Sequence, residues 1–139
     1  MKKVGILNAH LSHVIATLGH TDLLTICDAG LPIPKQADCV DLALTPGIPS
    51  FLASFDAVIS ECFVEKVILA EEIKQKNPLI HNALLQRLEQ LSKQQNNQIE
   101  IDYVSHTEFK QLSQASKGFV RSGECTPYAN IIISCGVPF

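Results

Sequence analysis

A short apolar run that breaks into a glycine- and proline-rich loop constrains the fold of this chain more than any other feature. Residues 23–27 are almost all apolar, and their number and composition are typical of a buried β-strand. Asp28 follows directly, and the next six residues include one glycine and two prolines. In an open α/β sheet, ligands bind beyond the carboxyl ends of the strands. The segment therefore predicts a buried strand that ends at Asp28, with this carboxylate facing a small polar ligand.

The composition is typical of one folded domain. The chain has 139 residues, 46% of them apolar, which is enough to bury a core, so we expect a single domain over residues 1–139. Eleven Lys and Arg against 14 Asp and Glu leave a net charge of −3 without a basic cluster, which argues against a nucleic-acid partner. No apolar run has the length of a membrane span, and the N-terminus lacks the apolar core of a signal peptide. We therefore expect no membrane partner.

The cysteines indicate a reducing compartment. Their number is odd, they are widely spaced, and they form no Cys-x-x-Cys motif: Cys27, Cys39, Cys62, Cys125 and Cys135. This pattern disfavours both a disulfide framework and a zinc ribbon. We expect reduced thiols, a cytoplasmic location and no metal site.

Strands alternate with helices along the chain, which predicts a layered α/β fold: one domain with a mixed β-sheet flanked by helices. Apolar spacing and capping residues predict helices at 9–18, 50–55, 64–76 and 78–95, with a further helix beginning at Ser105. Short apolar or alternating runs predict strands at 22–27, 39–43, 57–63, 99–103, 118–121 and 130–135.

His20 is a candidate proton donor. It follows Gly19, the predicted end of the first helix, where the helix dipole favours an imidazolium. The alternative role is a simple cap on the helix carbonyls. Asp28 has two possible roles as well, an Asx-type turn onto the amides of Ala29 and Gly30 or a contact with a ligand hydroxyl, and both can hold at once. We expect His20 and Asp28 to share one pocket, in which they move protons without a cofactor.

The other histidines give weaker indications. His106 lies near the start of a helix, where an exposed position is the ordinary expectation, and it gains interest only if the fold brings it to His20. His10 and His13 are one helical turn apart, but no third ligand is evident nearby, so we interpret them as surface residues. His81 lies on the long helix and is expected to be solvated.

A turn-rich segment before the last strand carries groups suited to a sugar. Tyr128 offers a ring face and a hydroxyl, and Asn130 offers a donor and an acceptor. The alternative is a structural turn in which Tyr128 packs and Asn130 satisfies loop amides. Cys125 is a poor nucleophile candidate, because the neighbouring Glu124 disfavours its thiolate.

Three blocks in order along the chain resemble the family of ribose pyranases, or ribose mutarotases, and the related fucose mutarotases. The blocks are residues 18–22 (LGHTD), 27–34 (CDAGLPIP) and 121–133 (RSGECTPYANIII). One position departs from the expected pattern, since Thr126 stands where the family has serine, but it keeps the hydroxyl.

The resemblance implies a cofactor-free isomerase that interconverts the β-pyranose and β-furanose forms of D-ribose. It implies His20 as the proton donor, and Asp28, His106, Tyr128, Ala129 and Asn130 as the residues that bind the sugar. It also implies a ring-shaped homo-oligomer, a decamer of stacked rings, with each site near a subunit boundary. Mutarotation of another sugar such as fucose, and sugar binding without catalysis, remain the alternatives.

Overall fold

Six strands form one mixed sheet in the order β2-β5-β1-β6-β3-β4. The computed structural model describes all residues, 1–139. The strands are β1 (Leu23–Cys27), β2 (Cys39–Asp41), β3 (Val64–Ala70), β4 (Glu100–Val104), β5 (Gly118–Arg121) and β6 (Ile131–Cys135). β6 is antiparallel to both of its neighbours, β1 and β3, while the other pairs are parallel. The carboxyl ends of five strands therefore meet at one edge of the sheet, together with the beginning of β6.

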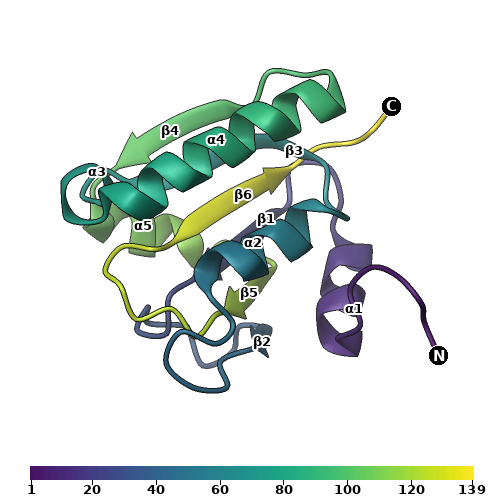
Figure 1. The fold of residues 1–139 in the computed structure, drawn as a ribbon, viewed down its shortest axis with the longest axis horizontal. Helices are drawn as coiled ribbons and strands as arrows, with labels where there is room; N and C mark the ends of the chain where they lie inside the picture. The colour runs from purple at the N-terminus through teal and green to yellow at the C-terminus, as the bar shows by residue number, and fades with distance from the viewer.

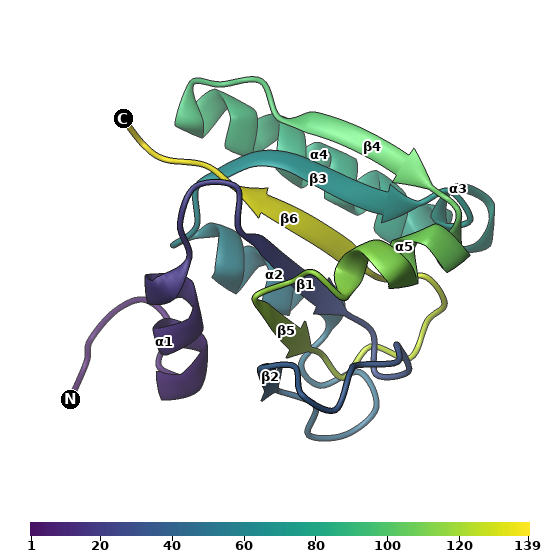
Figure 2. The ribbon, with the colours of Figure 1, turned by 180° about the vertical axis from the view of Figure 1, so that it is seen from behind.

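Helices cover both faces of this sheet. They are α1 (Ala9–Thr17), α2 (Phe51–Ile59), α3 (Ile73–Lys76), α4 (Pro78–Gln95) and α5 (His106–Ser113). Helices α2 and α4 lie on one face, and α5 lies on the other (Figures 1 and 2). The layered α/β fold with a mixed sheet is thus confirmed.

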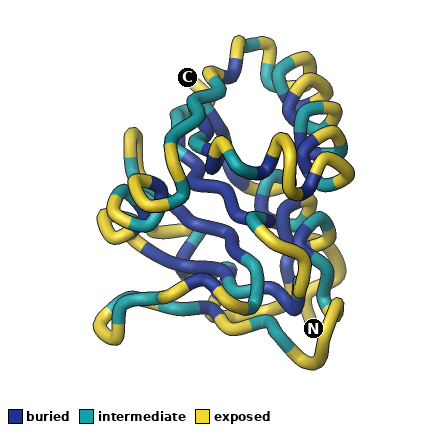
Figure 3. The backbone as a smooth tube through the Cα atoms, turned by 90° about the vertical axis from the view of Figure 1, so that its left-hand side faces the viewer, coloured by how far each residue is buried: buried dark blue, intermediate teal, exposed yellow.

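Alternation along the central strands divides the core between the two faces. Ile131 and Ile133 of β6 belong to the larger apolar cluster, which includes residues of α1, α2 and α4. Ile132, between them, belongs to the smaller cluster with Phe109 of α5. Successive strand residues point to opposite faces, so a strand buried on both faces supplies both clusters. Figure 3 shows this buried centre, with exposed residues in the loops and on the outer helix surfaces.

The sequence interpretation of residues 57–76 is wrong. The predicted strand at 57–63 falls on the end of α2 and the following loop, and the predicted helix at 64–76 is strand β3 followed by the short α3. Helix α2 continues to Ile59 because Phe51, Phe55 and Val58 form one buried stripe at helical spacing. In β3, the apolar residues are continuous from Val67 to Ala70, because the strand has neighbours on both sides and helices on both faces. Such a run does not distinguish a strand from a helix by its period.

The expectation for His81 is also wrong. This side chain lies on the buried stripe of α4 and is 8% exposed. Its Nε2 atom is 2.7 Å from the Tyr103 hydroxyl, which supplies the hydrogen-bond partner that a buried imidazole requires.

Candidate functional site

The edge where the parallel strands end gathers most of the predicted site residues. Asp28 follows β1, His106 follows β4, and Tyr128, Ala129 and Asn130 lie immediately before β6. These segments are far apart in the sequence, and the sheet order brings them together because β6 lies between β1 and β3. We refer to Asp28, His106, Tyr128 and Asn130 as the Asp28 cluster.

Asp28 and Asn130 form a reciprocal pair at the centre of this cluster. The backbone N–H of Asp28 donates to Asn130 Oδ1 (2.9 Å), and Asn130 Nδ2 donates to Asp28 Oδ2 (2.8 Å). Gly30 N donates to the other carboxylate oxygen, Oδ1 (2.9 Å), so the predicted Asx-type turn is present. Asn130 is only 1% exposed, whereas Asp28 is half-buried. A carboxylate has about four acceptor positions, so capacity for ligand hydroxyls remains.

Tyr128 and His106 form an aromatic surface beside this pair. Their ring centroids are 5.0 Å apart with an interplanar angle of 87°, an edge-to-face contact, and His106 also stacks on Phe109 at 6.3 Å. Tyr128 has a φ of 58°, which is rare for a bulky residue. Strained backbone of this kind clusters at functional sites, because the surrounding structure must hold it in place.

His106 favours the neutral imidazole. Burial lowers the pKa of His106 below its ordinary value of 6.5, and the nearby charge of Lys110 adds to this effect. The carboxylates of Glu72 and Asp28 act in the opposite direction but do not prevail. The ring atom Nδ1 is buried without a hydrogen-bond partner, an unusual state that a bound ligand or water can relieve. A neutral imidazole at pH 7 is able to accept a proton.

Residues that the sequence interpretation missed hold these loops in place. Asn77 Nδ2 donates to the Thr126 hydroxyl (2.8 Å) and to the Pro127 carbonyl (2.9 Å), just before Tyr128. Thr126 in turn donates to Glu124 Oε1 (3.0 Å), so its hydroxyl has a structural use. The only signal for Asn77 in the sequence is its place before Pro78 as the cap of a helix.

The glycine in this loop is required by a close approach of the backbone. A Cβ atom on Gly123 would lie 2.5 Å from the carbonyl oxygen of Ile48. Gly123 N donates to the Pro49 carbonyl, and its own carbonyl accepts from Gly47 N, which ties the loop at 45–49 to the segment before Tyr128.

His20 lies at the opposite edge of the sheet, so the expectation of one pocket shared with Asp28 is wrong within a single chain. His20 precedes β1 and Asp28 follows it. The five residues of β1 span about 17 Å at roughly 3.3 Å per residue. Nearness in sequence misled here, because an extended strand separates its two ends by the greatest possible distance.

At that edge His20 pairs with Glu65, another residue that the sequence interpretation missed. Its Nε2 atom is 3.0 Å from Glu65 Oε2, and both side chains are partly exposed. His20 does not cap helix α1, since Lys117 Nζ donates to the Thr17 carbonyl instead. Thr21, the next residue, has a φ of 68°, a strained value for a β-branched side chain.

The remaining histidine and acidic residues form no metal centre. No group of three or more His, Cys, Asp or Glu side chains is placed to hold a metal ion. His10 is instead 2.6 Å from Asp38. The five principal surface cavities are lined by residues outside the Asp28 cluster, and none includes His20. No helix has both the length and the apolar character needed to cross a membrane.

Comparisons with known proteins cover essentially the whole chain. The model of the RbsD/FucU transport protein family matches residues 1–138. The chain is 68% identical to the D-ribose pyranase of Pasteurella multocida over 139 residues, which is 100% of both proteins. The solved structure of Bacillus subtilis RbsD complexed with D-ribose superimposes with a TM-score of 0.88 at 47% identity, covering 100% of each chain.

A more distant solved structure has the same fold. The fucose mutarotase of Streptococcus pneumoniae, in complex with L-fucose, gives a TM-score of 0.76 at 22% identity, covering 94% of each chain. The full-length family match and the high identity to a pyranase agree with the resemblance of the three sequence blocks. The chain therefore belongs to the RbsD/FucU family.

Proposed function

We propose that this chain is an isomerase that interconverts the β-pyranose and β-furanose forms of D-ribose. One observation carries the proposal: the chain is 68% identical, over its full length, to the D-ribose pyranase of Pasteurella multocida. The similar Bacillus subtilis RbsD, at 47% identity, was solved in complex with D-ribose. The Asp28 cluster offers the matching chemistry, with a fixed carboxylate for hydroxyl groups and an aromatic surface for the C–H face of a sugar.

In this proposal the sugar contacts Asp28, His106 and Tyr128, while the buried residues Ala129 and Asn130 support these side chains from the protein interior. The buried positions of Ala129, 0% exposed, and Asn130, 1% exposed, support this division. Asn130 acts through the Asp28 carboxylate, which it holds with the bond from Nδ2. Charge-assisted hydrogen bonds of this kind fix orientation more strongly than neutral ones.

The proposed reaction is ring opening and reclosure through the free aldehyde. His20 donates a proton to the ring oxygen as the bond between this oxygen and the anomeric carbon breaks. His106, whose lowered pKa keeps its imidazole neutral and free to take a proton, accepts the proton of the anomeric hydroxyl, while the Asp28 carboxylate accepts hydrogen bonds from the sugar. Rotation of the carbon chain then presents another hydroxyl to the aldehyde, and the two proton transfers reverse.

Because His20 is separated from the Asp28 cluster within one chain, the proposed mechanism needs two copies of the chain to complete one site. We propose that His20 of one copy faces the Asp28 cluster of the next in a ring-shaped homo-oligomer, a decamer of stacked rings. Large apolar side chains remain exposed on the single chain, which supports burial between copies: Val4, Leu7, Leu44, Ile48 and Leu79. We place the enzyme in the cytoplasm, a location that the odd number of widely spaced cysteines supports.

Saturation-transfer NMR on equilibrated D-ribose tests the activity. The protein is expected to accelerate transfer between the pyranose and furanose signals, and His20→Ala to reduce this gain by about 10²-fold or more, the usual contribution of a general acid. His13→Ala, which removes another exposed histidine at the same end of the chain, is the matched control. Undiminished exchange in His20→Ala would remove this residue from the mechanism, and faster exchange of L-fucose than of D-ribose would reassign the substrate.

Mixed oligomers test whether two copies build one site. Chains carrying His20→Ala and chains carrying Asp28→Asn are each expected to be inactive. When the two are co-expressed, random assembly gives sites with both native residues at about one quarter of positions, so exchange is expected to return in part. Mixed oligomers that are no more active than either parent would contradict the shared site.

A further inference from the structure

Two buried cysteines meet at the edge of the sheet that carries His20. Cys62 lies in the loop between α2 and β3, and Cys135 is the last residue of β6. Their sulfur atoms are 3.6 Å apart and form a hydrogen bond, and the two residues are 8% and 3% exposed. The proposed reaction uses neither thiol.

The surroundings of the two thiols make them unequal. The hydrogen bond from Cys135 lowers the pKa of Cys62, in spite of burial, whereas the same bond and burial raise the pKa of Cys135. Of the two thiols, Cys62 is therefore the one that loses its proton more readily, and Cys135 is the one that holds its proton more strongly. The thiolate is the form that reacts with oxidants, so the pair has one attacking sulfur and one neighbour that resolves the product.

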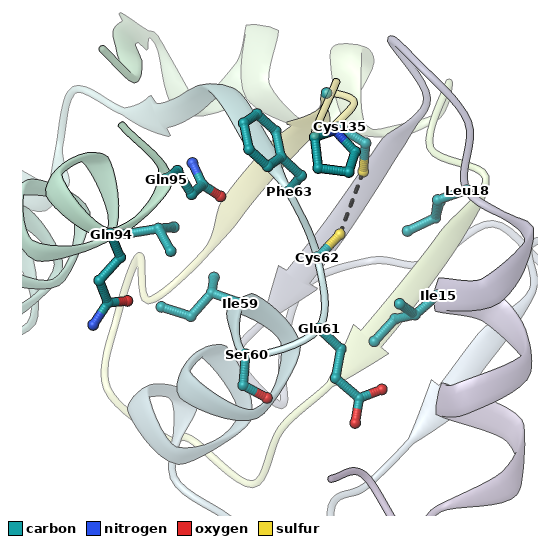
Figure 4. A pocket seen from close by; sticks show the side chains of 13 residues that line it. Ile15, Leu18, Ile59, Ser60, Glu61, Cys62, Phe63, Gln94, Gln95 and Cys135 are labelled. Atoms are coloured by element: carbon teal, nitrogen blue, oxygen red, sulfur yellow. Dashed lines mark hydrogen bonds between the residues drawn. The ribbon is translucent and has the colours of Figure 1, made fainter. Parts of the chain in front are cut away.

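A surface cavity adjoins both cysteines. Its volume is about 470 Å³, and Cys62 and Cys135 both line it. Figure 4 shows the two thiols facing each other between α1 and α2, with Ile15, Leu18 and Ile59 nearby. Both apolar and polar side chains line this cavity, so a small, uncharged oxidant can enter it.

We propose that Cys62 and Cys135 are a redox modification site, at which hydrogen peroxide forms a reversible disulfide within one chain. The Cys62 thiolate attacks one oxygen of the peroxide, the O–O bond breaks, and hydroxide leaves, so that Cys62 becomes a sulfenic acid. Cys135 then loses its proton and attacks the Cys62 sulfur, the S–O bond breaks, and the hydroxide leaves as water. In sum, two thiols and one peroxide give one disulfide and two waters.

The position of Cys135 places this bond beside the His20 turn. Thr21 N donates to the Cys135 carbonyl (2.8 Å), and Cys135 N donates to the Asp22 carbonyl (2.9 Å). The new covalent link would join this end of β6 to the loop that precedes β3. Glu65, the second residue of β3, pairs with His20. Formation of the disulfide does not depend on the proposed isomerase activity, so it can be tested separately.

Peptide mapping of the oxidised protein tests the proposal. The reduced native protein is exposed to graded hydrogen peroxide, the remaining thiols are alkylated, and the digest is examined by mass spectrometry. The expected product is a pair of linked peptides containing Cys62 and Cys135, lighter by two hydrogens, which dithiothreitol returns to two free thiols. Cys125→Ser removes the exposed thiol and is the matched control, in which the linked pair is expected unchanged.

Two outcomes would overturn the proposal. In one, Cys62 and Cys135 are both still alkylated at a peroxide dose that oxidises Cys125. In the other, Cys62 reaches the sulfinic acid without any link to Cys135. In Cys62→Ser, Cys135 is expected to remain a free thiol, and the map of the native protein decides the question if this variant does not fold.

Discussion

Replacing Asn130 by aspartate tests the bond that holds the Asp28 carboxylate in place. Aspartate has nearly the same shape as asparagine, and its Oδ1 atom still accepts the backbone N–H of Asp28. The change removes only the Nδ2 donor, which now lies 2.8 Å from Asp28 Oδ2, and puts a second carboxylate there. The side chain at position 130 is buried, so the new carboxylate itself gains little solvation.

The expected loss of stability is about 3 kcal/mol. A hydrogen bond to a charged group contributes roughly 1.5–3 kcal/mol. Two like charges about 4 Å apart repel by roughly 4 kcal/mol at an effective dielectric constant near 20. Much of this repulsion is removed because Asp28 is half-exposed and because the pair can share one proton. The lost hydrogen bond and the remaining repulsion together therefore cost about 3 kcal/mol, well below the sum of the two full contributions.

The exchanged double variant, Asp28→Asn with Asn130→Asp, is the matched control. In it an amide at position 28 faces a carboxylate at position 130, so the reciprocal pair re-forms and most of the stability is expected to return. Ribose exchange is expected to stay low, because the carboxylate has left the position that faces the sugar. Stability is read from urea unfolding by circular dichroism at one fixed protomer concentration. A loss below about 0.5 kcal/mol in Asn130→Asp, or a double variant as unstable as the single one, would refute this account.

Two further predictions concern residues that do not face the sugar: Asn77, which holds the loop before Tyr128, and His81, which is buried in α4. Asn77→Ala removes both side-chain bonds to the loop before Tyr128, so the KM for ribose is expected to rise several-fold with a smaller change in kcat, measured by exchange NMR at increasing sugar concentration, and an unchanged KM would contradict this positioning role. Burial lowers the pKa of His81, so the unfolded chain binds a proton more readily than the folded one, and stability is expected to fall as the pH drops from about 6.5. His81→Gln, which keeps a partner for Tyr103, is expected to flatten that decline in urea unfolding at a series of pH values, and an equally steep decline would show that other groups cause it.

The residues at the strand ends were predictable because local and global signals agree there. The run at 23–27 has the length of a strand, and Asp28 stands at the change to glycine and proline. The rule that ligands bind beyond the carboxyl ends of strands then places this residue at a site. His106 joins the cluster for a reason that the sequence hides, since only the strand order puts the end of β4 near the beginning of β6.

The errors arose where one pattern fits two structures. Val64, Val67 and Ile68 have the spacing of a helix, yet they lie in a strand that is covered on both faces. For His81, by contrast, the helical spacing in the sequence did indicate a buried position, but the sequence interpretation did not apply it. It lies three residues before Leu84, seven before Leu88 and ten before Leu91, on the same buried stripe of α4.

The strained residues connect the fold to the proposed assembly. Thr21, which follows His20, and Tyr128, two residues before Asn130, both have positive φ values, and each such residue costs roughly 1–3 kcal/mol. They lie at opposite edges of the sheet, where each is held by backbone bonds to β6 or to its flanking loop. The same rigid sheet that holds His20 at one edge and the Asp28 cluster at the other prevents them from meeting inside one chain. On the proposed function, catalysis therefore requires the association of two copies. Dilution below the concentration at which the copies associate is expected to abolish ribose exchange, although each separate chain keeps the Asp28 cluster that contacts the sugar.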